Sequence, residues 1–372
     1  MLLFRHNKVY MSFEPTKPNN DLPSIQNHGL KNQDFTDLLL CAQKELSELK
    51  GYTLRLPNPE ILLSPSVIRE SVESSIIENI NTTTTDVFKN QLLPEAEQTK
   101  ADKEVIRYKS AIDWGMEKLD ESSVSTRLLQ GIIRKLLPST DGQFRTKQNH
   151  IVNSSTGNII YTPPVVNKIP DLVRDWEKFA NNTEGDNLHP LIRIALAHYQ
   201  LEAIHPFDDG NGRTGRIVMV LQLLKEDMLS LPVLYISSYI NKHKSDYYRL
   251  LQACNENQDF KPFVEFMLQG FHSQALETKN TLLSIMSLYY ETKTNIKLNH
   301  SKIYSADLLE SLFMSPIISP SRLSKDLDIH RVTASKYLQE LKAAGILEVM
   351  KYKTYNFYYN KKFLDILNGN KI

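Results

Sequence analysis

Cysteine is almost absent from this chain of 372 residues, which contains only Cys41 and Cys254. These residues form neither a CxxC pair nor a Cys/His cluster, so the sequence supports no disulfide framework and no structural zinc site. Long apolar runs are lacking too. The N-terminal MLLF run stops at Arg5, and no later stretch reaches the roughly 18 uncharged apolar residues that span a bilayer. We therefore expect a cytoplasmic protein with no membrane partner.

The chain also lacks an excess of charge of either sign. Its 44 Lys and Arg residues nearly balance its 43 Asp and Glu residues, so the whole molecule has no strong field that would draw it to nucleic acid or membrane. Hydrophobic residues make up 41% and charged residues 23%, which is ordinary globular usage and excludes a disordered or collagen-like chain. At this length we expect more than one folding unit.

Helical periodicity covers most of the chain before residue 300. In one segment Ser64 is a suitable N-cap, and Pro65 then takes the first helical position. Residues 191–201 and 217–224 are apolar on nearly all sides, which predicts two helices at the centre of a bundle. The predicted helices cover residues 34–49, 63–80, 104–119, 125–136, 170–179, 190–204, 212–227, 244–255 and 262–276.

Two parts of the chain lack this helical period. Residues 1–35 contain several prolines and little periodicity, which predicts a poorly ordered or surface-wrapped arm. Between Pro138 and Pro170, two short runs at 150–152 and 159–161 flank a polar stretch. Two strand-like runs on either side of such a stretch predict a β-hairpin.

The last roughly 70 residues have the pattern of a small separate unit. Three short helices, at 305–313, 321–327 and 331–341, precede two strand-like runs at 346–351 and 355–359. This order is that of a winged helix-turn-helix. The predicted fold is therefore mainly α: a helical bundle with a β-hairpin flap, plus a C-terminal winged helix-turn-helix domain. The predicted parts are an N-terminal helical region (1–100), a core (101–275), a connector (276–300) and the winged helix (301–372).

The loop between the two apolar helices contains a run of residues suited to ligand binding and catalysis. Residues 205–216 are HPFDDGNGRTGR. Glycines on both sides of Asn211 let backbone N–H groups turn inward, and the helix that begins here adds its positive end, so the loop predicts an anion-binding nest. Arg213 and Arg216 would add guanidinium forks, which suit bidentate contacts with phosphate oxygens.

Two further residues of this loop complete a site for phosphate chemistry. Asp209 is placed to hold a Mg²⁺ that bridges phosphate oxygens, since carboxylates and substrate phosphates are usual ligands of this ion. His205 is the only general base in the loop, and its unperturbed pKa of about 6.5 lets it accept a proton at neutral pH. We therefore expect His205 to deprotonate a hydroxyl while the arginines and the metal align a polyphosphate for in-line attack.

Residues 205–216 match the motif HxFx(D/E)GNGRxxR at every defined position, and the chain thereby resembles the Fic (filamentation induced by cAMP) family. The resemblance implies the Fic helical bundle and an adenylyltransferase that moves AMP from ATP to a Ser, Thr or Tyr hydroxyl of a protein, itself included, releasing pyrophosphate. It implies that His205 is the base, that Phe207 anchors the loop in the core and that Asp209 is the metal ligand. The implied ATP ligands in this loop are Gly210, Asn211, Gly212, Arg213, Thr214, Gly215 and Arg216.

The resemblance covers roughly residues 63–270. The stretch 142–145, GQFR, looks like the family's G-x-(Y/F)-R element. The hairpin looks like the flap that lays a target segment beside the site. Strand addition there would position a target hydroxyl by backbone hydrogen bonds and would leave the target's identity open. The predicted docking residues are Ile159, Ile160 and Tyr161.

The helix at residues 247–255 is similar to the family's adenine-side helix. The resemblance implies that Tyr247 and Asn255 hold the nucleoside. From the residues alone, a Tyr pair on a helix is also typical of core packing, so both interpretations stay open.

Residues 74–79, SSIIEN, match the family's inhibitory pattern (S/T)xxxE(G/N). Ser74 and Glu78 are four residues apart and share a helix face. In family members with this pattern the glutamate pairs with the second motif arginine, here Arg216, and keeps the ATP γ-phosphate out of a productive pose. A carboxylate in an arginine fork would compete with phosphate for the same donors. Some relatives with this glutamate also remove AMP, so the reverse reaction stays open.

The winged helix has a modestly basic balance of 11 Lys or Arg against 7 Asp or Glu over residues 301–372. DNA binding and protein contact or homodimerisation are equal alternatives, because this excess is small beside the phosphate contacts of strong DNA binders. Beside AMP transfer from ATP, a nucleotide-sensing DNA-binding regulator and a Fic enzyme that uses another nucleotide also stay open. The predicted DNA-facing residues are Arg331, Thr333, Ser335, Lys336, Lys351, Tyr352 and Lys353.

Overall fold

The computed structural model describes residues 4–5, 8–9, 13–22, 25, 29–56, 58–119, 123–153 and 156–369. The chain forms two compact units. The first consists of Met1–Lys44, Ser110–Met228 and Tyr239–Ser273, and the second of Glu45–Lys109, Leu229–Ser238 and Gln274–Ile372. Residues of both units occur in α1 (Thr36–Thr53), α4 (Lys100–Leu119), α9 (Ser237–Lys242) and α11 (Lys261–Asn299).

The first unit is built around two buried helices, α7 (Pro190–Ile204) and α8 (Asn211–Lys225). In α7, 13 of the 15 residues are buried, and in α8, 12 of the 15. A helix that is apolar on all sides has to be covered on all sides. The covering helices include α5 (Thr126–Leu136), α6 (Ile169–Ala180) and α10 (Lys244–Asn257). The predicted pair of central helices is thereby confirmed, and the loop between them is held at both ends by buried residues.

The β-hairpin predicted from the sequence is also present in the first unit. It consists of β3 (Ile151–Val152) and β4 (Ile159–Tyr161), which pair antiparallel with an irregularity between Ile151 and Val152. Gly157 has φ +72° in the turn, a backbone conformation that favours glycine. Residues 154–155 of the predicted turn lie outside the described residues.

The second unit contains the predicted winged helix. Its sheet has the order β5-β7-β6, and β7 pairs antiparallel with both neighbours. The helices α12 and α15 pack against α2 (Glu60–Ile77), which is the helix that carries Ser74. The elements of this unit's C-terminal part are α12 (Ala306–Met314), β5 (Ile317–Ile318), α13 (Pro320–Asp326), α14 (Arg331–Ala343), β6 (Glu348–Tyr352), β7 (Tyr355–Tyr359) and α15 (Lys361–Leu367).

The predicted start of α2 was wrong. The sequence places Ser64 as the cap and Pro65 at the first helical position, whereas the helix begins at Glu60 and Pro65 lies inside it. Ile61 and Leu63 are 1% and 8% exposed. Burial of these two side chains stabilises the turn that precedes the proline, which outweighs the hydrogen bond that Pro65 cannot donate.

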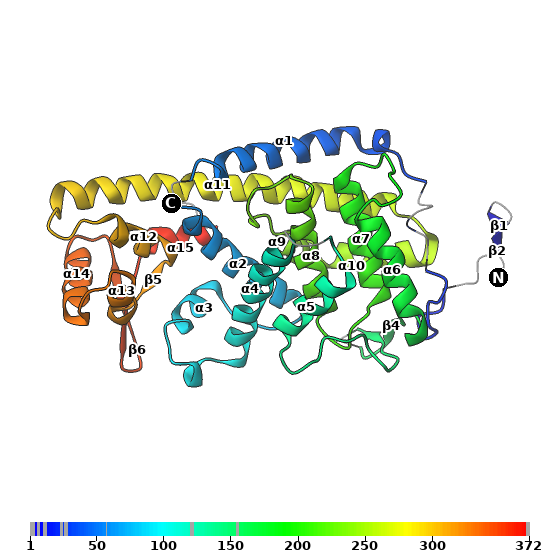
Figure 1. The fold of residues 1–372 in the computed structure, drawn as a ribbon, viewed down its shortest axis with the longest axis horizontal. Coiled ribbons are helices and arrows are strands. Elements are labelled where there is room, and N and C mark those ends of the chain that lie inside the picture. Colours follow the sequence, from blue (N-terminus) through cyan, green and yellow to red (C-terminus); the bar gives the residue numbers. More distant parts are fainter. Residues whose placement is uncertain are drawn as a thin grey trace. The chain divides into compact units, whose positions relative to one another are not determined.

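The helix predicted for residues 262–276 is much longer than expected. α11 runs unbroken to Asn299 and has 39 residues, so helix replaces most of the predicted connector at 276–300 (Figure 1). Leu282, Ile285 and Ile296 are buried and continue the helical spacing. The exposed apolar residues Leu283 and Tyr290 and the buried polar Thr292 interrupt the pattern, which hid this period in the sequence.

Smaller elements were not predicted. They are β1 (Phe4–Arg5), β2 (Lys8–Val9), α3 (Thr84–Asn90) and the already named α9, β5 and α15.

Both cysteines have free thiols, with Cys41 exposed and Cys254 buried. Within the described ranges, no helix combines the length and the apolar content needed to cross a bilayer. Those ranges also hold no group of three or more His, Cys, Asp or Glu side chains arranged for a metal ion.

Candidate active site

The loop between α7 and α8 begins and ends with left-handed backbone. His205 caps α7 with φ 49° and ψ 60°, and Gly210 caps α8 with φ +79°. A Cβ on Gly210 would lie 2.6 Å from Cδ1 of Ile133, so both the backbone angle and the space require glycine there. A histidine in this region is locally strained, which is common at functional sites.

The side chain of Asn211 holds the loop closed. Its Oδ1 accepts the backbone N–H of Phe207 at 2.9 Å, and its Nδ2 donates to the carbonyl of Phe207 at 2.8 Å. Phe207 is 2% exposed, and its ring centroid lies 5.8 Å from that of Phe144. The predicted anchoring role of Phe207 thus agrees with its burial. The amide of Asn211 is used inside the loop, which leaves the backbone of the Gly-Asn-Gly turn as the part suited to phosphate.

The orientation of His205 defines which ring nitrogen can act as a base. Nδ1 lies 3.3 Å from the carbonyl oxygen of Glu202. A carbonyl only accepts hydrogen bonds, so this contact favours the tautomer that is protonated at Nδ1. His205 is half-buried.

The charged residues of the motif lie at the first turn of α8. Arg213 and Arg216 are 4% and 2% exposed, whereas the side chain of Asp209 is 70% exposed. Asp209 Oδ1 accepts the N–H of Gly210 at 2.6 Å and lies 3.3 Å from Nη2 of Arg213. Thr214 is fully buried. The structure therefore gathers the predicted base, carboxylate and arginines on one loop and one helix turn.

Behind the loop, α7 and α8 approach each other closely at Gly215. A Cβ on this residue would lie 2.5 Å from Oε1 of Glu202 and 3.2 Å from Nδ1 of His198. The role of Gly215 visible here is close helix packing, while its predicted phosphate contact stays a prediction. His198 and Glu202 were missed in the sequence, although they precede His205 by seven and three residues and so lie close to its face of α7.

The two residues predicted to hold the nucleoside have partners within the protein. Tyr247 is 2% exposed, and its hydroxyl lies 2.8 Å from Nε2 of His198. Asn255 Oδ1 accepts the hydroxyl of Tyr199 at 2.9 Å and the Nδ2 of Asn19 at 3.5 Å. Tyr247 fits the core-packing alternative, and nucleoside contact by either residue stays a prediction.

The flap is fixed at its root. Tyr161 is buried and donates its hydroxyl to the carbonyl of Ala203 at 2.7 Å, and burial raises the pKa of this hydroxyl. Ile159 and Ile160 are half-buried. Of the three predicted docking residues, Tyr161 therefore has its side chain engaged within the first unit, and docking of a target on the flap stays a prediction.

The predicted N-terminal arm packs against the root of the flap. The backbone N–H of Asn19 donates to the carbonyl of Thr162 at 2.9 Å, and Thr162 Oγ1 donates to the carbonyl of Pro15 at 2.6 Å. The ring of Phe13 stacks on Tyr161 with centroids 6.3 Å apart. Of the two predicted alternatives, residues 13–20 therefore follow the surface-wrapped one, while much of the chain before them lies outside the described residues.

The predicted inhibitory pattern forms the end of α2 in the second unit. Ser74 is fully buried, and Glu78 is an exposed C-cap. Asn79 has φ 61°, its N–H donates to Ile76, and the N–H of Ile80 donates to Ser75, both at 3.0 Å. These bonds form a Schellman motif, which explains physically why the pattern needs Gly or Asn after the glutamate.

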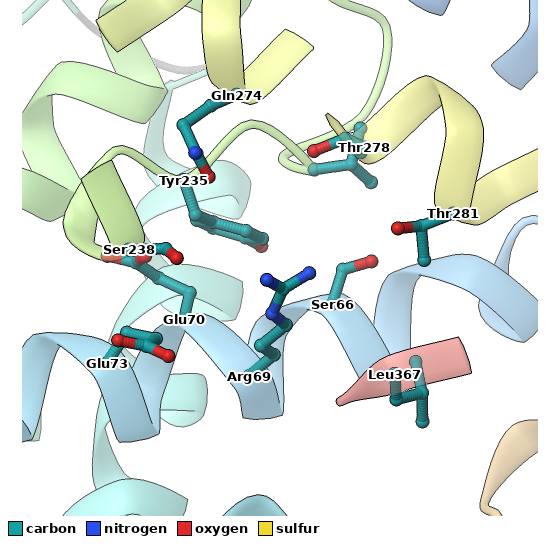
Figure 2. A pocket seen from close by; sticks show the side chains of 11 residues that line it. Ser66, Arg69, Glu70, Glu73, Tyr235, Ser238, Gln274, Thr278, Thr281 and Leu367 are labelled. Carbon is teal, nitrogen blue, oxygen red and sulfur yellow. The ribbon is translucent and has the colours of Figure 1, made fainter. Parts of the chain in front are cut away.

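The second unit also contains a polar cleft beside α2, shown in Figure 2. Arg69 projects from the helix and forms an ion pair with Glu277. Glu70 accepts a hydrogen bond from the hydroxyl of Tyr108 at 3.1 Å and another from Ser237. The cleft contains no residue predicted to act in catalysis, so the Fic loop remains the candidate active site. The lining residues are Ser66, Arg69, Glu70, Glu73, Val233, Tyr235, Ser238, Gln274, Thr278, Thr281 and Leu367.

Three family models match the chain. Residues 36–117 match the Fic/DOC family N-terminal model, residues 123–223 match the Fic/DOC family model, and residues 288–363 match the protein adenylyltransferase SoFic-like C-terminal domain. The chain belongs to the Fic/DOC family, as the motif at residues 205–216 predicted.

Similar proteins match either the core or most of the chain. Proteins called protein adenylyltransferase Fic from Drosophila mojavensis and Drosophila melanogaster are each 36% identical over 130 residues. The match is 35% of this chain and 23% and 24% of theirs, so the chain spans about a quarter of the curated relatives' length. A Fic family protein from Desulfovibrio desulfuricans G20 has a TM-score of 0.53 at 21% identity, covering 93% of this chain and 98% of that one. A Fic domain containing signaling protein from Bacteroides thetaiotaomicron VPI-5482 has a TM-score of 0.52 at 17% identity, covering 68% and 96%. These two structures support the mainly helical Fic fold.

Proposed function

We propose that this chain is a protein adenylyltransferase that moves AMP from ATP to a Ser, Thr or Tyr hydroxyl of a protein, itself included, and releases pyrophosphate. The observation that carries the proposal is the orientation of His205, whose Nδ1 faces a carbonyl so that Nε2 is the basic nitrogen. It stands at the start of a glycine turn that leads into two buried arginines. The curated relatives named for this activity match the same part of the chain.

The reaction follows from this arrangement. The hydroxyl proton passes to Nε2 of His205, and the hydroxyl oxygen forms a bond to the α-phosphorus of ATP. The bond from the α-phosphorus to the oxygen bridging to the β-phosphate breaks, and pyrophosphate leaves. Arg213 and Arg216 offset the negative charge of the phosphates, and the backbone N–H groups of residues 210–212 orient them. Gly215 and Thr214 complete this turn of helix in the proposed ATP site.

Asp209 fits a Mg²⁺ that accompanies ATP. Its carboxylate is 70% exposed on the loop, and one carboxylate together with substrate phosphates and water is an ordinary ligand set for this ion. Mg²⁺ bound there would neutralise phosphate charge. The adjacent Arg213 orients the carboxylate, because its Nη2 lies 3.3 Å from both oxygens of Asp209.

The substrates would approach from two sides of the loop. Tyr247 and Asn255 are the proposed nucleoside contacts, and the flap residues 159–161 are the proposed docking edge for a protein segment. A strand edge binds through backbone groups, so it tolerates targets of different sequence. A cytoplasmic location and a homodimer are part of the same proposal.

Glu78, with Ser74 on the same helix, is the proposed inhibitor of this enzyme. The support is the match to the inhibitory pattern and the capped helix end, which fixes the backbone around Glu78. The proposed action is competition with the ATP γ-phosphate for Arg216. The Glu78→Gly variant is expected to incorporate more AMP into itself than the wild type, and equal incorporation would remove this part of the proposal.

The decisive experiment uses ATP labelled at the α or the γ position, followed by mass spectrometry of the modified protein. Label from the α position alone identifies AMP transfer. His205→Ala is expected to lose transfer by about 10²–10⁴-fold while ATP binding changes little. His272→Ala, whose imidazole contacts the carbonyl of Cys41, is the control and should transfer AMP at the wild-type rate.

Other outcomes would replace the proposal. Label from the γ position would indicate phosphate transfer, and preferential incorporation from UTP would indicate another nucleotide. Loss of AMP from a premodified protein that depends on Glu78 would indicate the reverse reaction. No incorporation by wild type or Glu78→Gly would contradict AMP transfer.

The alternative of a nucleotide-sensing DNA-binding regulator depends on the winged helix. Lys353 in the wing forms an ion pair with Glu97 at 2.8 Å, and Tyr355 donates its hydroxyl to the same carboxylate. Lys89 lies 4.7 Å from the ring centroid of Tyr352. Two of the predicted wing contacts are therefore engaged within the second unit, and DNA or protein contact by the winged helix stays a prediction.

A further inference from the structure

Arg145 is a buried arginine at the end of the GQFR stretch in the first unit. Only 2% of the residue is exposed. Its Nε donates to the carbonyl of His205 at 3.0 Å, and its Nη1 donates to the carbonyl of Lys147 at 3.2 Å. Its Nη2 donates to the carbonyl of Pro164, and its backbone N–H donates to the carbonyl of Pro206 at 2.9 Å.

These acceptors belong to three different segments. His205 and Pro206 open the Fic loop, Lys147 leads into the flap, and Pro164 follows its second strand. One side chain thus ties the catalytic loop to both ends of the hairpin. Backbone carbonyls are fixed points of the chain, so bonds to three of them restrict the relative position of the segments more than a bond to one flexible side chain would.

The chemistry of these bonds requires a guanidinium. Its planar fork has donors in fixed directions, whereas the ammonium of lysine is a single point charge. Burial lowers the pKa of Arg145, while the charge of Asp208 raises it, and the guanidinium keeps its proton. Removal of this side chain would break a buried bond to the carbonyl of Pro164 and part-buried bonds to the carbonyls of His205 and Lys147.

We propose that Arg145 is a positioning residue that sets the spacing between the flap and His205, and thereby how well a target hydroxyl meets Nε2. This inference rests on the proposed AMP transfer. The described side-chain bonds of Arg145 go to backbone carbonyls at residues 147, 164 and 205, so we expect its effect to fall on the target rather than on ATP.

The test compares Arg145→Lys and Arg145→Met with the wild type, all in a Glu78→Gly background if that variant is the more active one. The kcat/KM for a protein target is expected to fall about 10²-fold, since a misplacement of about 1 Å costs this much in positioning. The Kd for ATP is expected to stay within about twofold. Lysine should not rescue the loss, because it cannot reproduce the fork.

Arg193→Met is the matched control for a merely structural effect. Arg193 is 3% exposed in the same unit and donates to the carbonyl of Leu188 at 2.9 Å, with Asp186 as its ion-pair partner. Its loss should lower Tm while kcat/KM per folded protein stays at the wild-type value. Equal losses of kcat/KM in the Arg145 and Arg193 variants would overturn the proposal, as would normal transfer by Arg145→Lys.

A second readout does not depend on activity. Amide hydrogen exchange of β3 and β4 should become at least tenfold faster in Arg145→Lys, with α6 unchanged. Unchanged exchange in the hairpin would overturn the positioning role. If the wild type transfers no AMP but the hairpin loses protection in the variant, the function of the chain needs revision while the link made by Arg145 stands.

Discussion

His198 and Tyr247 join α7 to α10 through a hydrogen bond inside the first unit. Nε2 of His198 lies 2.8 Å from the hydroxyl of Tyr247, and the two rings are 6.1 Å apart between centroids. Burial lowers the pKa of His198 to about 3, and the positive charge of Arg216 acts in the same direction. The imidazole is therefore neutral over the whole physiological range. It serves as a packing and hydrogen-bonding group behind the loop.

This buried histidine predicts a pH dependence of stability. In the unfolded chain the pKa is 6.5 and in the folded protein about 3, so between these values only the unfolded state binds the proton. The contribution of His198 is complete above pH 6.5 and is lost as the pH falls toward 3. The limiting slope is about 1.4 kcal/mol per pH unit.

Urea unfolding at a series of pH values between 7 and 4 measures this slope. His198→Gln is the control, because glutamine can still bond Tyr247 but does not titrate in this range. The free energy of unfolding of the variant is expected to fall less steeply with acid than that of the wild type. Parallel curves would show that His198 is not the group responsible.

A second prediction concerns Gly131 in the middle of α5. A Cβ there would lie 1.7 Å from the nearest ring atom of Trp114, and an indole ring cannot shift as a flexible chain end can. Gly131→Ala is expected to lower the free energy of unfolding by about 1–3 kcal/mol. The matched control is Gly51→Ala in α1, where nothing lies within 4 Å of the added methyl and a gain of up to about 1 kcal/mol is expected. Thermal unfolding that ranks the two variants in the opposite order would contradict the contact with Trp114.

Strong local patterns made part of this fold predictable. The predicted helix at 190–204 and the strand at 355–359 coincide with α7 and β7, because their apolar spacing and their Pro or turn boundaries agree with the tertiary structure. The Fic loop was predictable for a different reason. Its functional residues are contiguous in sequence. The base, the carboxylate and the arginines could therefore be recognised together without knowledge of any long-range contact.

The remainder depends on long-range packing that no local pattern specifies. Arg145 is 60 residues from His205 in sequence. Its bonds to the carbonyls of His205 and Pro164 depend on the folded position of the hairpin and could not be predicted from the sequence. The use of the Asn211 amide within the loop, rather than toward a ligand, likewise follows from the backbone path of residues 205–211. The length of α11 was hidden because exposed Leu283 and Tyr290 and buried Thr292 interrupt its apolar spacing.

Asn79 provides a test of the inhibitory helix that leaves Glu78 in place. Its left-handed backbone costs most residues about 1–2 kcal/mol, but not glycine. Asn79→Val should therefore unravel the Schellman end of α2, loosen Glu78 and raise AMP incorporation, whereas Asn79→Gly should keep both the helix end and the inhibition. Incorporation assays with α-labelled ATP compare the variants. Equal activity of the two would indicate that the helix cap does not support the action of Glu78.

The last prediction concerns Thr162, which links the N-terminal arm to the flap. This residue is fully buried, its Oγ1 donates to the carbonyl of Pro15 at 2.6 Å and lies 2.8 Å from Nδ1 of His150. Thr162→Val keeps the shape but removes both bonds, and loss of a buried hydrogen bond costs about 1–3 kcal/mol. The amide of Asn19, which donates to the backbone of residue 162, should then exchange at least tenfold faster with solvent.

Thr140→Val is the control for this substitution. Thr140 is exposed and donates its hydroxyl to the carbonyl of Leu137 at 3.1 Å, so its loss should leave the exchange of Asn19 unchanged. Exchange in β4 separates two mechanisms for Thr162. If only the arm loses protection, the arm does not stabilise the flap, whose position is then set by Arg145 and Tyr161. If β4 loses protection as well, the arm is part of what keeps the flap in place, and its removal should then raise the KM for a protein target. Unchanged exchange of Asn19 in Thr162→Val would contradict the link altogether.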